Sequence, residues 1–285
     1  MKALSLFALS VLPFASIQSQ TITATETVAR IRKEFPKESR PNGVDTFKAG
    51  DSTARVTGIA VTMMATFDVL QRAVKQGDNL IITHEPTFYS HRDTTLSLEK
   101  ENDGVLAAKK KFIADHGLII WRFHDAPHAQ SPDVIKSSTA KALGWSSFVM
   151  KDNASAYVIP RTTLRALASR AAEKLGARAV RISGDGAASV SRIVMTEGFA
   201  GFPAVRRLIQ QTNPDVVVIG EDHEWESIEY VVDAIAEGRI RGLIVLGHIP
   251  SEQAGMQAIA ERLRSLVPEV PVHFVPTTDP FRPIR

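Results

Sequence analysis

Four short apolar runs in this sequence each end in side chains that bind metals, and this repetition constrains the fold more than any other feature. The runs span residues 79–83, 117–123, 215–219 and 240–246. The side chains at their ends are His84 and Glu85, then His124, Asp125 and His128, then Glu221, Asp222 and His223, and finally His248 and Glu252. In parallel α/β sheets, ligands bind outside the carboxyl ends of the strands, where residues far apart in sequence converge. The pattern therefore predicts a metal site at such an edge.

The fourth run shows how the last pair of these side chains is presented. Residues 243–246 predict a buried strand, Gly247 a backbone turn, and Ser251 the cap of a helix that continues to about residue 266. His248 and Glu252 then flank the start of this helix, where a cation site and an anion site are equally easy to build. A glutamate near a helix start is also favourable simply because of the helix dipole, so this pair alone does not define a site.

The segments before residue 145 alternate between strands and helices. After a helix at residues 23–35 and a loop at 36–52, we expect strands at 56–62, 80–83 and 118–123, and helices at 66–75, 105–116 and 134–143. The polar stretch at residues 91–103 is expected to be a mobile excursion near the site. This alternation predicts an α/β protein whose largely parallel sheets are flanked by helices.

The middle of the chain differs from the first part in the order of its predicted strands and helices, and this difference predicts a second lobe. Strands are expected at residues 156–159, 179–182 and 190–195, and helices at 163–175 and 204–211, before a strand at 216–219 leads back towards the first lobe. Gly198 and Gly201 favour a tight turn into a helix, although they would also let backbone approach a ligand. The predicted division is a signal peptide at 1–19, a first α/β lobe at 20–145 that carries His84 and His128, a second lobe at 146–213, and a C-terminal segment at 214–285 that completes the metal site.

The amino-terminal residues predict export. Met1 and Lys2 precede an apolar stretch at residues 3–15 that is too short to span a bilayer, and a small polar region follows. The alternative is that this stretch forms an apolar first helix of the fold. No later stretch is long and apolar enough to cross a membrane, so the mature protein is expected to be periplasmic or secreted, with no membrane partner.

Composition limits the chemistry of the site. The chain has 285 residues and no cysteine, which excludes disulfides, thiol catalysis and thiolate metal ligands. Any metal must be bound by histidine and carboxylate, which favours zinc, manganese or iron. The net charge is only +3, and the one basic run, at residues 109–111, predicts a solvated helix face rather than a nucleic-acid site.

The order of these segments resembles one known family. A strand, helix and strand are followed by Ile-Ile-Thr-His-Glu-Pro, then Phe-His-Asp-Ala-Pro-His, Ile-Gly-Glu-Asp-His and Leu-Gly-His-Ile-Pro-Ser-Glu. This order is similar to that of the Nif-three-like dinuclear metal centre family, some members of which are named GTP cyclohydrolase I type 2. The resemblance covers nearly everything after the predicted signal peptide. It implies a two-lobed α/β subunit that assembles into a ring-shaped homo-hexamer and holds two divalent metal ions.

The resemblance also implies the metal ligands. Carried over position by position, they are His84, Glu85, His128, His248 and Glu252. The family has a second histidine where this chain has Glu85, and an aspartate where this chain has His128. One imidazole and one carboxylate have thus exchanged places, and the balance of three histidines and two carboxylates is kept.

The polar residues near these ligands are candidates for further roles. Either glutamate ligand could bridge two ions, because a carboxylate has two oxygens to share. Glu221 and His223 are candidates for the general base or for holding a ligand in place, and a solvated loop would explain them equally well. His124 and Asp125 are close enough in sequence to assist, although Asp125 is equally compatible with a turn or a cap.

Together these features predict an exported hydrolase that uses a metal-activated water to cleave a small-molecule phosphoester, ester or cyclic amide. The alternative is a non-catalytic metal-binding hexamer that stores or delivers ions or serves as an interaction scaffold. An enzyme needs an open coordination position and a proton acceptor, whereas a structural site is closed. Five protein ligands shared by two ions leave room for water, which favours catalysis.

Overall fold

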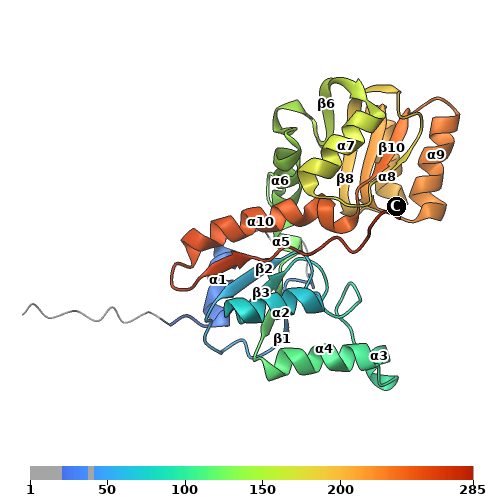
Figure 1. Ribbon diagram of the computed structural model, residues 1–285. Coiled ribbons are helices and arrows are strands. Elements are labelled where there is room, and N and C mark those ends of the chain that lie inside the picture. Colours follow the sequence, from blue (N-terminus) through green and yellow to red (C-terminus); the bar gives the residue numbers. More distant parts are fainter. Residues whose placement is uncertain (1–20, 38–41, 285) are drawn as a thin grey trace, which may run out of the picture.

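Two β-sheets and a long helix between them organise the part of the chain that the computed structural model describes, residues 21–37 and 42–284. This helix is α10, His248–Leu266, and it crosses from one sheet to the other (Figure 1). The predicted signal peptide at residues 1–19 lies outside the described residues. None of the helices in the described part is both long and apolar enough to cross a membrane.

The first sheet has five strands in the order β1-β4-β3-β2-β11, and only the pairing of β1 with β4 is antiparallel. The strands are Phe47–Ala49 (β1), Ile59–Thr62 (β2), Leu80–Thr83 (β3), Ile119–Arg122 (β4) and Val272–Phe274 (β11). β2, β3 and β4 are buried along their whole length, as expected for parallel strands covered on both faces. One face packs against α1 (Ala24–Glu34) and α10, and the other against α2 (Phe67–Gln76) and α4 (Gly104–Asp115).

Local signals in the sequence determine where these helices begin and end. Thr23 and Glu26 form a capping box at the start of α1, and the Thr66 side chain accepts a hydrogen bond from the Val69 N–H at the start of α2. Gly77 ends α2 with a φ of 82°, a left-handed conformation that glycine adopts at little cost. The observed bounds therefore lie close to the predicted ones.

Two short elements lie within segments that we predicted to be irregular. The predicted loop at residues 36–52 contains β1, a three-residue edge strand. The polar stretch at 91–103 contains the helix α3, Leu96–Lys100, which buries no residue. Neither has the apolar periodicity that predicts an element; β1 forms because β4 offers it a free edge.

The second sheet has six strands in the order β5-β6-β8-β9-β10-β7. They are Val149–Met150 (β5), Asn153–Thr163 (β6), Arg181–Ser183 (β7), Ser189–Phe199 (β8), Val216–Glu221 (β9) and Gly242–Val245 (β10). β9 pairs in parallel with β8 and β10, while the pairings of β5, β6 and β7 are antiparallel. This sheet is therefore mixed, whereas we expected largely parallel sheets. Parallel pairing needs a crossover connection. One helix connects β8 to β9 and another connects β9 to β10, and these are the two parallel pairs of the sheet.

Helices cover both faces of the second sheet. α6 (Val134–Leu143) and α7 (Leu164–Leu175) pack on one face, and α8 (Phe202–Thr212) and α9 (Glu229–Ala236) pack on the other. The strand that we expected to lead back to the first lobe is β9, which lies inside this sheet. The chain returns to the first sheet along α10 and β11. Its final segment then runs back to the second sheet (Figure 1), where Asp279 accepts a hydrogen bond of 2.9 Å from the Arg178 N–H.

The start of α10 differs from the prediction. Gly247, with a φ of 98°, is the N-cap, and the helix begins at His248, before the predicted cap Ser251. Ser251 instead lies in the first turn, where its Oγ donates to the His248 carbonyl and accepts from the Gly198 N–H. His248 and Glu252 consequently occupy one face of the helix, a full turn apart.

Candidate metal centre

The five predicted ligands come together where β3 and β4 end and α10 begins. Glu252 Oε2 lies 3.6 Å from His84 Nε2 and 3.2 Å from His248 Nε2, and Glu252 Oε1 lies 3.9 Å from His128 Nε2. His248 Nε2 also lies 3.3 Å from Glu85 Oε1. His84 and Glu252 are buried, and Glu85 is 9% exposed. Residues from three distant parts of the chain thus form one cluster of nitrogen and oxygen donors.

His84 directs an unprotonated nitrogen into this cluster. Its Nδ1 lies 3.1 Å from the Phe123 carbonyl, and a carbonyl can only accept, so Nδ1 carries the proton. The Nε2 lone pair then faces Glu252 and the Nε2 of His128, which is 3.2 Å away. Burial lowers the pKa of His84 to about 4. The ring is therefore neutral at pH 7, which is the form that binds metals.

His128 and His248 are oriented by carboxylates in the same way. The Nδ1 of His128, on the short helix α5 (Asp125–Ala129), lies 3.0 Å from Asp133 Oδ2, and the Nδ1 of His248 lies 2.8 Å from Glu221 Oε1. Each ring thus turns Nε2 towards the glutamates, an arrangement that commonly orients histidine ligands of metals. Burial alone would lower the pKa of His248, but its carboxylate neighbours raise it far above its ordinary value. A bound ion would have to displace that proton.

His124 is a further donor beside the five predicted ligands. Its Nδ1 lies 3.0 Å from Asp125 Oδ1, and its Nε2 lies 3.6 Å from Glu85 Oε1. Nitrogens of His84, His124 and His128 all lie within 4.8 Å of one another. The spacing of His124 and His128 was a usable signal, because one helical turn brings such side chains to the same face.

Glu85 is held by a buried arginine. Arg122, at the end of β4, is fully buried; its Nη2 lies 3.2 Å from Glu85 Oε2, and its Nε donates to the His84 carbonyl at 3.0 Å. This leaves Oε1 of Glu85 facing His124 and His248. Burial would raise the pKa of Glu85, but the neighbouring histidines lower it well below its usual range. Glu85 is therefore an ionised donor with one free oxygen.

The buried carboxylate of Glu252 supports the assignment of a cation site. Its Oε2 is buried and has no hydrogen-bond partner among the described residues, although two histidine nitrogens lie within 4 Å of it. A buried carboxylate oxygen that accepts no hydrogen bond is costly. A metal ion among these nitrogens and oxygens would satisfy it, so the residues fit the metal that the sequence predicts.

Gly198 brings backbone directly against the ligands. Its φ is 54°, and a Cβ added to it would lie 2.4 Å from Glu252 Oε1 and 3.0 Å from His248 Nε2. The tight turn that we favoured for this glycine therefore explains only part of its role. At Gly201, whose φ is 77°, an added Cβ would meet only the Phe199 ring, at 3.6 Å.

We expect Gly198→Ala to weaken metal binding by about tenfold or more, because the methyl group would displace Glu252 and His248. Gly201→Ala is the matched control: its positive φ also strains the backbone, but nothing at the metal site moves. Calorimetric titration of each variant with zinc would measure the effect. An equal loss of affinity in both variants would mean that backbone strain, rather than crowding of the ligands, is responsible.

Acidification should destabilise the metal-free protein through His84. An unfolded histidine has a pKa of about 6.5, whereas burial lowers that of His84 to about 4. The unfolded state therefore takes up the proton first, so the contribution of neutral His84 is present above about pH 6.5 and is lost as the pH falls towards the folded pKa. In urea titrations of chelator-treated protein, the free energy of unfolding should fall more steeply across this window for wild type than for His84→Gln. Parallel curves would contradict this assignment.

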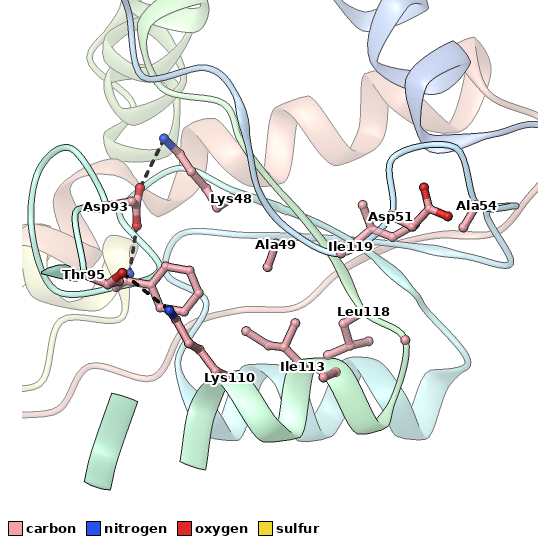
Figure 2. A pocket seen from close by; sticks show the side chains of 14 residues that line it. Lys48, Ala49, Asp51, Ala54, Asp93, Thr95, Lys110, Ile113, Leu118 and Ile119 are labelled. Atoms are coloured by element: carbon pink, nitrogen blue, oxygen red, sulfur yellow. Dashed lines mark hydrogen bonds and ion pairs between the residues drawn. The ribbon is translucent and has the colours of Figure 1, made fainter. Parts of the chain in front are cut away.

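Two cavities lie near this cluster. One, of about 520 Å³, is lined by Glu85, Glu221 and His248 among others, and gives access to the candidate ligands. The other, of about 500 Å³, contains none of them (Figure 2). It is lined by Lys48 and Asp93, whose Nζ and Oδ2 lie 3.4 Å apart. Asp93 Oδ2 also lies 3.7 Å from Arg122, so a line of buried charges joins the second cavity to Glu85.

The two residues predicted to be catalytic are placed differently. Glu221 contacts His248 and lines the first cavity. His223 is hydrogen-bonded to Glu226 at 2.8 Å and stacks on Trp225. No hydrogen bond or ion pair within the described part of the chain joins His223 to the metal ligands. The structure thus brings Glu221 to the cluster and leaves His223 in a separate, exposed group.

These features define a class of protein: a two-sheet α/β subunit with a buried cluster of histidine and glutamate that could hold metal ions. The sequence profile of Duf34/NIF3 (NGG1p interacting factor 3) matches residues 19–280, and the chain belongs to this family. A comparison with curated proteins gave no significant match.

Solved structures of similar fold agree with this membership. The Staphylococcus aureus hypothetical protein SA1388 superposes with a TM-score of 0.71 at 17% identity, covering 92% of this chain and 99% of that one. A Bacillus cereus protein related to NIF3 has a TM-score of 0.70 at 14% identity, with 93% and 99% covered. Reduced HcgD from Methanocaldococcus jannaschii has a TM-score of 0.62 at 16% identity, with 90% and 98% covered. At these identities the likeness establishes the fold.

Proposed function

We propose that this protein is an exported metal-dependent hydrolase that cleaves a phosphoester, ester or cyclic amide bond of a small molecule. Two divalent ions, of zinc, manganese or iron, would be held by His84, Glu85, His128, His248 and Glu252, with His124 as an additional donor. One observation carries the proposal. Each histidine of this set has Nδ1 against an oxygen acceptor and Nε2 directed at the same two glutamates.

The donor set suits these metals and supports catalysis. Imidazole and carboxylate bind zinc, manganese and iron, and the chain offers no thiolate. Six side chains shared by two ions leave coordination positions for water and substrate, and the adjoining cavity of about 520 Å³ gives a small molecule access to them. When bound, such ions polarise the attacked bond and lower the pKa of a nearby water.

The residues around the ligands would control protons and position. Glu221 holds one proton of His248 on Nδ1, so Nε2 is the nitrogen that would bind the metal once the ion displaces the second proton. Its side chain is 54% exposed and lines the cavity, so its second oxygen is available to accept a proton from the attacking water. Arg122 fixes Glu85 so that only Oε1 faces the site. We also keep His223 as a candidate proton acceptor, since it follows Glu221 closely in sequence.

One observation favours the alternative, a non-catalytic hexamer that stores or delivers ions or acts as a scaffold. His84 is fully buried and Glu252 is 4% exposed, so the inner part of the cluster is closed to solvent. Closed sites are typical of structural metals. The open side, at Glu85 and His248, is what makes catalysis the better proposal.

The test is a hydrolysis screen of metal-loaded mature protein. Bis(4-nitrophenyl) phosphate, 4-nitrophenyl acetate and a cyclic dihydropyrimidine would represent the three bond types. We expect turnover of at least one class that disappears on chelation, returns with added zinc, manganese or iron, and falls about 100-fold in Glu221→Gln. Tightly bound metal without turnover of any of the three would favour the non-catalytic assembly.

Export and assembly are proposed on separate grounds. Residues 1–19 have the composition of a signal peptide, and the family resemblance implies a homo-hexamer. Intact-mass measurement of protein recovered from the periplasm or medium should give a chain that begins near residue 20. Light scattering of the same sample should give six times the mass of that chain.

A further inference from the structure

Lys109 is a buried cation that forms no ion pair with any of the described residues. It lies on α4, is 5% exposed, and donates from Nζ to the Thr87 carbonyl at 2.6 Å. Its ammonium group has three protons to donate, and no carboxylate of the described residues lies within ion-pair distance; Asp93 acts on it only from further away. A buried charge that is not paired is expensive. An anion bound beside Nζ would compensate this charge.

The surroundings of Lys109 belong to the cavity beside the candidate metal ligands. Lys109 and Thr87 both line the cavity of about 520 Å³ that reaches Glu85 and His248. The Thr87 hydroxyl is fully buried and has no hydrogen-bond partner among the described residues. The cation and the unused hydroxyl thus belong to residues that line the same cavity, and each lacks an acceptor that a ligand could supply.

The remaining walls of the cavity define the rest of the ligand. Met64, Phe67 and Tyr89 line it, and the Tyr89 ring lies 5.0 Å from Lys109 Nζ. Phe67 is the first residue of α2, so the positive end of that helix dipole also faces this region. An apolar or aromatic body would pack against these side chains. Of the carboxylates lining the cavity, Glu85 is paired with Arg122 and Glu221 with His248, so neither is directed at Lys109 as an ion-pair partner.

We propose that Lys109 and Thr87 form a subsite for an anionic group of the substrate, a carboxylate or a phosphate. In naming a substrate, the inference rests on the proposed hydrolase. The substrate would be a small molecule with an anionic end at Lys109, an apolar or aromatic body, and its scissile bond at the metal centre. Burial lowers the pKa of Lys109 to about 8, so the side chain is still charged at pH 7. A bound anion would raise this pKa and favour the charged form further.

Calorimetric titration with inorganic phosphate and with acetate would test the subsite. Both anions would be titrated at millimolar concentration into metal-loaded and chelator-treated protein, for wild type, Lys109→Met and Lys111→Met. Lys111 is the matched control, because it lies on the same helix but is 74% exposed and paired with Asp115. We expect Lys109→Met to bind the preferred anion about ten- to a hundredfold more weakly in both forms, and Lys111→Met to match wild type. The anion that binds more tightly identifies the group.

Two results would overturn the subsite: unchanged affinity in Lys109→Met, or no binding of either anion by wild type. Thr87→Val, which keeps the carbonyl contact to Lys109 and is isosteric, provides a second variant should Lys109→Met fold poorly. It should weaken binding severalfold, and wild-type affinity would contradict the proposal. The outcome is separable from that of the hydrolase. If anion binding depends on Lys109 but the protein shows no turnover, the subsite is supported and the hydrolase is contradicted. If the protein shows turnover but anion binding does not depend on Lys109, the hydrolase is supported and the subsite is contradicted.

Discussion

His248→Ala is expected to remove most of the metal from the protein as purified. His248 Nε2 lies within 3.3 Å of both glutamate ligands, so its loss removes a donor from both sides of the cluster. Loss of an orienting partner alone typically costs about 10- to 100-fold in metal affinity, and loss of the ligand itself should cost more. Mature protein purified without chelator should contain about two ions per subunit, and the variant far fewer, as measured by elemental mass spectrometry.

A surface histidine is the appropriate control for this measurement. His116 is exposed, and its Nδ1 lies against the Phe112 carbonyl at the end of α4, away from the metal ligands. His116→Ala should keep the metal content of wild type. Near-zero metal in folded wild type, with no uptake of added zinc, manganese or iron, would instead mean that Glu85 and His128 mark a degenerate site. An interaction role would then become the better hypothesis.

Arg122→Met should be among the most destabilising substitutions in the chain. Arg122 is fully buried and pairs with Glu85 and Asp93, while it also donates to the carbonyls of His84 and His91. Methionine fills similar space but removes the guanidinium from both carboxylates, so that Asp93 keeps only Lys48 and Glu85 keeps only its histidine neighbours. Breaking one side of a buried ion pair typically costs about 3–5 kcal/mol. Urea unfolding of chelator-treated protein would measure the loss without the contribution of bound metal.

An exposed ion pair provides the comparison. Arg262 is 61% exposed and pairs with Glu34, so Arg262→Met should cost at most about 1 kcal/mol. Similar losses for the two variants would show that Arg122 contributes no more than a surface arginine. In that case water, rather than the guanidinium, would have to compensate Glu85.

The predictable parts of this protein are those in which local chemistry and burial agree. β3 was predicted at its observed bounds because an apolar run follows Gly77, which ends the preceding helix, and the structure buries all four of its residues. α6 was predicted equally well because Gly144 marks its end, and the structure shows Asp133 capping its start. The five candidate ligands lie just after such predictable elements. The sequence could therefore indicate which residues are the candidate ligands, but not how far apart they lie.

The features that escaped prediction depend on contacts between distant segments. Arg122 reads as one polar residue in an apolar strand, and only the position of Glu85 explains its burial. Ser251 was expected to cap α10, but the positive φ of Gly247 starts the helix earlier. The direction of His124 also requires the position of Glu85. None of these three features could be predicted from the residues of its own segment alone.

The position of α10 has a thermodynamic consequence. Its first turn carries His248 and Glu252, while its later residues Ile259 and Leu263 belong to the core of the first sheet. The second sheet supplies Glu221 and Gly198 to the same first turn. An ion bound there would act as a removable cross-link between the two lobes, and its binding energy would add to their cohesion. Metal availability would then set how tightly the lobes are held and how well the chain resists proteases.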